Sequence, residues 1–96
     1  MFLSEQNKRE ILSKYENDTS DKVLSHLKRN YPSYDFDFDW METPFKQVMI
    51  NDKMYQLQSN KKYLVNKIFQ QIEDKFLDTE KRVVRRTIKK YIDGIS

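Results

Sequence analysis

The side chains with the most informative chemistry lie near the C-terminus, between Lys81 and Lys90. If this segment is a helix, with about 100° of rotation per residue, its cations share one half of the surface. These cations are Lys81, Arg82, Arg85, Arg86, Lys89 and Lys90. Three of the five arginines of the chain are in this group, and a guanidinium can bind a phosphate or a guanine edge through two parallel hydrogen bonds. The pattern therefore predicts a surface that binds nucleic acid.

The distribution of charge along the chain favours the same prediction. The 96 residues include 18 Lys and Arg and 15 Asp and Glu, for a formal net charge of +3. Residues 61–96 hold ten cations and five acids, whereas residues 1–60 hold eight and ten. We expect Lys61 and Lys62 to extend the basic surface. In the alternative interpretation, the charged face is simply solvated and favoured by the helix dipole. An anionic membrane is a poorer partner, because the opposite face has Val, Ile and Thr in place of Trp, Phe and Leu.

A second candidate binding segment, Tyr34–Trp40, alternates aromatic with acidic residues. This period of two predicts a strand or an extended loop with one aromatic and one acidic face. One interpretation buries the rings in the core and leaves the aspartates in water. In a second interpretation, the segment docks on a basic and apolar groove of a partner protein or adds to the edge of a sheet. In a third, the acids lie against the chain's own basic helix. The partner-binding residues would be Asp35, Phe36, Asp37, Phe38, Asp39 and Trp40.

The spacing of Asp35, Asp37 and Asp39 resembles the opening of a calcium-binding loop. Such a loop needs a glycine at its sixth position and a bidentate glutamate at its twelfth. Trp40 and Lys46 occupy these positions here. We therefore expect no metal site in this segment.

The composition lacks most catalytic groups. The chain has no Cys, one Gly and one His, which is His26. Thiolate nucleophiles, zinc knuckles and glycine-rich phosphate loops are therefore excluded. Paired carboxylates such as Glu73 and Asp74 fall at positions expected to face solvent. The sequence predicts a protein that is not an enzyme, needs no cofactor and has no small-molecule substrate.

The N-terminal third predicts a two-helix hairpin. Ser4 and Glu5 suit a helix start, and the run Asn17–Ser20 suggests a break followed by a new cap. The second helix should end before Pro32, because proline disfavours helical backbone at the preceding residue.

The middle of the chain predicts a β-hairpin from Phe45 to Ser59. Asn51 and Asp52 suit a two-residue type I′ turn, in which both residues have positive φ. This register sets Ile50 opposite Lys53, Val48 opposite Tyr55 and Lys46 opposite Leu57. Its core face would consist of Val48, Ile50, Tyr55 and Leu57.

Two amphipathic helices complete the expected fold. Residues 60–77 carry an apolar stripe at helical spacing, and the last helix should run from residue 79 to about Ile92, with Gly94 as its terminating glycine. The two helices with a short turn between them are similar in outline to a helix-turn-helix, with Arg85–Ile88 in the recognition position. The fold class is thus α+β and helix-rich, with a β-hairpin or three-stranded sheet, in one domain over residues 1–96.

The sequence offers two functions. The first is a small non-enzymatic protein that binds nucleic acid through the last helix. The second is a protein-interaction or assembly component, such as a phage accessory or virion protein, in which the basic helix and segment 34–40 bind proteins. In a homo-oligomer, these two patches could meet between neighbouring copies. The absence of Ala and the abundance of residues with A/T-rich codons favour a low-GC genome, such as that of a bacteriophage or an AT-rich bacterium. Because no apolar run is long enough for a signal peptide or a membrane span, we expect a cytoplasmic protein.

Overall fold

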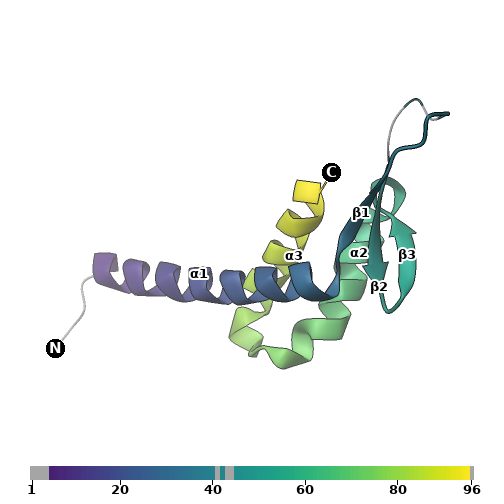
Figure 1. Ribbon diagram of the computed structural model, residues 1–96. Helices are drawn as coiled ribbons and strands as arrows, with labels where there is room; N and C mark the ends of the chain where they lie inside the picture. The colour runs from purple at the N-terminus through teal and green to yellow at the C-terminus, as the bar shows by residue number, and fades with distance from the viewer. Residues whose placement is uncertain (1–4, 41, 43–44, 96) are drawn as a thin grey trace.

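Helix α2 packs on one side of a small antiparallel sheet, α3 packs between α1 and α2, and α1 extends away from the end of the sheet (Figure 1). The computed structural model describes residues 5–40, 42 and 45–95, and the side chains among these from residue 12 onwards. The elements are α1 (Glu5–Asn30), β1 (Ser33–Phe36), β2 (Phe45–Ile50), β3 (Lys53–Gln56), α2 (Leu57–Ile72), the 3₁₀ turns η1 (Glu73–Lys75) and η2 (Asp78–Glu80), and α3 (Lys81–Ile95). The sheet order is β1-β2-β3. The predicted α+β, helix-rich class is confirmed.

The predicted N-terminal hairpin of helices is wrong, because α1 is one continuous helix of 26 residues. Asn17–Ser20 do not interrupt it. The Thr19 hydroxyl lies 3.1 Å from the Tyr15 carbonyl oxygen one turn earlier, so this polar side chain is satisfied within the helix. Packing against α3 then stabilises the segment as helix. The end of α1 at Asn30, ahead of Pro32, agrees with the prediction, whereas Ser4 lies outside the described residues.

The β-hairpin has the predicted turn. Asn51 and Asp52 both have positive φ, at 50° and 64°. Ile50 pairs with Lys53, and Val48 pairs with Tyr55, as the turn requires. The expected pairing of Lys46 with Leu57 does not occur, because β3 ends at Gln56 and Leu57 begins α2.

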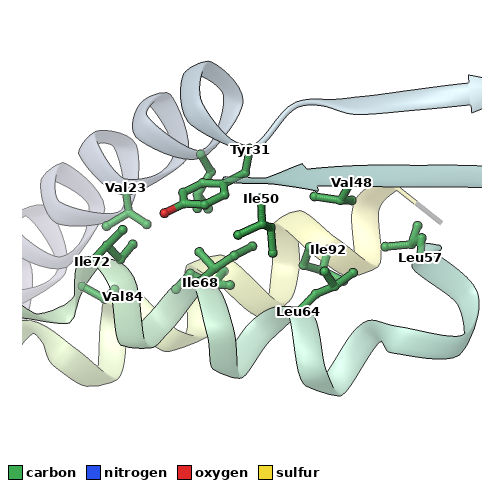
Figure 2. Close-up of a cluster of buried hydrophobic side chains, with 12 residues drawn as sticks. Val23, Tyr31, Val48, Ile50, Leu57, Leu64, Ile68, Ile72, Val84 and Ile92 are labelled. Atoms are coloured by element: carbon green, nitrogen blue, oxygen red, sulfur yellow. The ribbon is translucent and has the colours of Figure 1, made fainter. Parts of the chain in front are cut away.

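The core lies where β2, α1, α2 and α3 meet (Figure 2). Its fully buried side chains are Leu27, Ile50, Leu57, Leu64, Ile68, Ile88, Ile92, Val23, Val48 and Val84, with Ile72 almost completely buried. Tyr31 crosses the end of this core, and its hydroxyl donates to Gln71 Oε1 at 2.7 Å. Tyr91 of α3 donates in turn to the Tyr31 carbonyl at 2.6 Å. These two bonds connect the end of α1 to α2 and α3.

The aromatic side of β1 points away from the helices, which contradicts the interpretation that buries these rings in the core. Asp35 pairs with Lys46 of β2, and Lys46 shares its side of the strand with the buried Val48. Tyr34 and Phe36 must therefore lie on the opposite side of the sheet, because strand side chains alternate. Tyr34 is 44% exposed and Trp40 is 81% exposed. Residues 37–40 are irregular, so the strand covers only the first half of the predicted segment.

The two C-terminal helices form with shifted ends. α2 begins at Leu57 and has non-helical dihedral angles at Asn60, where the sequence predicted its start. It ends at Ile72, and residues 73–80 hold two 3₁₀ turns in place of the tight turn of a helix-turn-helix. α3 continues through Gly94 to Ile95. Gly94 has no positive φ and is not the terminating glycine that the sequence predicted.

The turn geometry gives a stability prediction. Asp52 has a φ of 64°, a region that glycine adopts without steric cost. We expect Asp52→Gly to raise the free energy of unfolding by about 0.5–1 kcal/mol. Asp52→Val should lower it by at least a similar amount, because a β-branched residue is strained there. Urea denaturation with an unchanged m-value measures both effects. A glycine variant no more stable than the valine variant would contradict the turn assignment.

Candidate nucleic-acid interface

Helix α3 lies between α1 and α2 and exposes one charged arc. Its buried residues are Val83, Val84, Thr87, Ile88 and Ile92. The opposite arc is exposed and carries Arg82, Arg85, Arg86, Lys89 and Lys90, together with Asp93. We call these five cations the basic face. Because the buried residues point into the core beneath the sheet, the basic face points away from the sheet.

Lys81 lies apart from the basic face. It is half-buried at the start of α3, and its Nζ is 3.0 Å from Asp78 Oδ1. The hydrogen bond with Asp78 raises the pKa of Lys81. This ion pair connects η2 to the first turn of α3, so Lys81 has a local partner that the sequence analysis did not assign.

Two arginines of the basic face contact the neighbouring helices. Arg85 donates to Asn66 Oδ1 of α2 at 3.0 Å, and its guanidinium carbon lies 4.6 Å from the centre of the Phe69 ring. Arg86 is 3.5 Å from Glu16 Oε2 of α1. Both contacts are at the surface, where an ion pair stabilises a protein by about 1 kcal/mol at most. Their main consequence is to fix the direction in which each guanidinium points.

A groove between α2 and α3 brings cations of both helices together. It has a volume of about 360 Å³ and is lined by Lys61, Lys62, Val65, Asn66, Arg85, Lys89 and Asp93. We call it the α2–α3 groove. The predicted association of Lys61 and Lys62 with the last helix is thus present in the structure. The predicted site is split, however, because Arg86 lies on the α1 side of α3, where its partner Glu16 belongs to α1.

The acidic segment does not neutralise this surface. Among the residues that the structure describes, the ion pairs of the cations in 81–90 are with Asp78 and Glu16. Asp35 is 3.8 Å from Lys46, which also donates to the Ile95 carbonyl at 2.7 Å. The interpretation that set the aspartates against the chain's own basic helix is therefore wrong for the described residues.

Glu80 positions the start of α3, and sequence reasoning missed it. Its carboxylate accepts from the Leu77 backbone N–H at 3.0 Å and lies 3.0 Å from the buried Thr19 hydroxyl of α1. The backbone hydrogen bond from Leu77, and then the Thr19 hydroxyl, lower the pKa of Glu80. The local signal is a carboxylate three residues after the helix-capping position. Nothing local indicates Thr19, which lies 61 residues away in the sequence.

Comparison of the chain with protein families, with curated proteins and with solved structures finds no match. Within the described ranges, no helix combines the length and the apolar character that crossing a membrane requires. The same ranges contain no group of three or more His, Cys, Asp or Glu side chains placed to hold a metal ion.

The environment of Glu80 gives a pH prediction. Because its folded-state pKa is below the ordinary value of 4.5, its ionised form stabilises the fold above that pH. This stabilisation is lost as the pH falls through the folded-state pKa. We expect Glu80→Gln to be less stable than the parent at neutral pH, with a difference that closes as the solution is acidified. Urea denaturation across the acidic range measures it. Glu42→Gln is an exposed control. If the stability difference between Glu80→Gln and the parent did not change with pH, the result would contradict a lowered folded-state pKa for Glu80.

Proposed function

We propose that this protein binds nucleic acid through the basic face of α3 and the α2–α3 groove. One observation carries the proposal. Cations from two helices converge on a single exposed surface, and the aspartates of segment 34–40 lie elsewhere. Phosphate is the chemical group that such a surface fits best, since each bound phosphate releases condensed counterions. The groove residue Asp93 is the one carboxylate among its lining side chains.

The mechanism we propose is mainly electrostatic. Arg82, Lys89 and Lys90 are exposed and form no ion pair within the described part of the chain. They can meet phosphates without first losing a partner. Lysine binds phosphate as a point charge, whereas arginine adds bidentate geometry. We therefore expect binding that depends strongly on salt and only modestly on base sequence.

A second candidate function, a protein-interaction or assembly role, is favoured by the exposed aromatic residues of segment 34–40. Phe38 is 43% exposed and Trp40 is 81% exposed. Aromatic side chains of this size are enriched where proteins meet. The carboxylates in the same segment would repel phosphate, so this surface is separate from the proposed nucleic-acid interface.

The test is a titration of labelled duplex and single-stranded DNA and RNA at several salt concentrations. The variant Arg82→Gln/Lys89→Gln/Lys90→Gln removes exposed cations and spares Arg85 and Arg86, which contact neighbouring helices. We expect it to bind at least tenfold more weakly at low salt. The slope of log affinity against log salt should become shallower by about 2–3.

The matched control removes the same number of cations elsewhere. Lys14→Gln/Lys28→Gln/Lys53→Gln takes the formal net charge from +3 to 0, as the first variant does, at exposed positions on α1 and β3. We expect it to keep most of the affinity and the parent salt slope. No binding by the parent at low salt would refute the proposal. Equal losses in the two variants would assign the binding to net charge and would also refute this interface.

A further inference from the structure

The sheet has an apolar side that α2 and α3 leave uncovered, and at one end of it Met49 shares a pocket with His26 and Asn30 of α1. The register places on it Tyr34 and Phe36 of β1, Phe45, Gln47 and Met49 of β2, and Met54 and Gln56 of β3. With Phe38 and Trp40, which continue beyond β1, we call these residues the outer sheet face. Figure 1 shows residues 37–40 continuing beyond β1, away from the three helices.

The aromatic rings of this face form a continuous stack. Phe36 stacks on Phe45 across the strands, with ring centres 5.2 Å apart. Phe36 and Phe38 are 6.4 Å apart, and Phe38 and Trp40 are 5.5 Å apart and nearly parallel. The rings therefore support one another at the surface and need no core to hold them. A partner would meet an ordered surface.

The outer sheet face carries no formal charge on its strands. The charged pair of β1 and β2, Asp35 and Lys46, lies on the helix side of the sheet. The strand residues that point outwards are Tyr, Phe, Met and Gln. The strand part of this face therefore offers no attraction to a polyanion or to a strongly basic protein. A glutamine amide both donates and accepts, so Gln47 and Gln56 can bond to the same residue types in a second copy.

The area is in the range that a dimer requires. Tyr34, Phe38, Trp40 and Met54 are 44%, 43%, 81% and 38% exposed, which corresponds to about 400 Å² of accessible surface. A standard interface buries about 800 Å² on each partner. These four side chains supply about half of that area, and the half-buried Phe36, Phe45 and Met49 and the two glutamines add to it.

We propose that the outer sheet face is the interface between two copies of this chain, packed sheet against sheet about a two-fold axis. Such packing covers an apolar sheet face in the same way as the second layer of a β-sandwich. The contact is isologous, so each copy uses the same residues and the assembly stops at a dimer. The basic faces would then point outwards from the two sides of the dimer, and both would stay accessible.

The test measures association without nucleic acid. Sedimentation velocity from low micromolar to near-millimolar protein should show a monomer–dimer equilibrium that high salt does not weaken. Trp40 is the only tryptophan of the chain, and its exposed indole would become buried. We expect its emission to shift to shorter wavelength over the same concentration range. Met54→Lys should raise the dissociation constant at least tenfold, because it buries an unpaired charge in an apolar interface.

Two control variants introduce a lysine in place of an exposed leucine outside the outer sheet face. Leu77→Lys lies in the connection before α3, where the side chain is 65% exposed, and Leu12→Lys lies on α1 at 57% exposed. Both should dimerise as the parent does. A monomer at every concentration, or an association that Met54→Lys leaves unchanged, would overturn the proposal. Species larger than dimers that dissociate with salt would also overturn it, since they would indicate contact between acidic and basic patches.

Discussion

The burial of Val84, Ile88 and Ile92 is the constraint on which the described surfaces depend. These side chains are inaccessible to solvent and complete a core that also takes residues from β2, α1 and α2. A helix of 3.6 residues per turn that buries this stripe must turn the residues between its members outwards. Arg82, Arg85, Lys89 and their neighbours are therefore exposed as a consequence of packing. Val48 and Ile50 of β2 are buried in the same core. Their burial determines which side of the sheet faces the core and which side faces away from it.

Sequence reasoning succeeded where the structure depends on local patterns. The turn at Asn51 and Asp52 and the amphipathic character of α3 follow from a few adjacent residues. It failed where contacts between residues far apart in the sequence determine the structure. Thr19 suggested a cap, but its hydroxyl lies beside the Glu80 carboxylate and inside a continuous helix. The aromatic residues of β1 were expected to lie in the core. Because Asp35 pairs with Lys46 on the helix side of the sheet, the aromatic rings lie on the opposite side. A period of two predicts two faces and cannot tell which one is buried.

Lys46 connects β1 and β2 to the end of α3 at the exposed edge of the core. Its ammonium is 3.8 Å from Asp35 and donates to the last described carbonyl of α3, that of Ile95. A cation at a helix C-terminus is favoured by the helix dipole, and here it also satisfies a carbonyl that has no partner within the helix. Asp35 is therefore paired with Lys46 of β2 and not with the basic face of α3. This contact separates the acidic segment from the cations of residues 82–90 and leaves the two surfaces independent.

The contacts of the two central arginines determine where on α3 a phosphate would bind most favourably. Arg85 uses one of its five N–H groups for Asn66 and rests on Phe69, so the remaining donors are available and already directed. Arg86 lies beside the Glu16 carboxylate, and a phosphate there would meet a like charge or would have to displace it. The α1 side of the basic face is therefore the weaker half. The α2 side combines Arg85 with Lys61, Lys62 and Lys89 around one groove, so that four cations there outnumber the single carboxylate of Asp93, and the centre of phosphate binding is expected there.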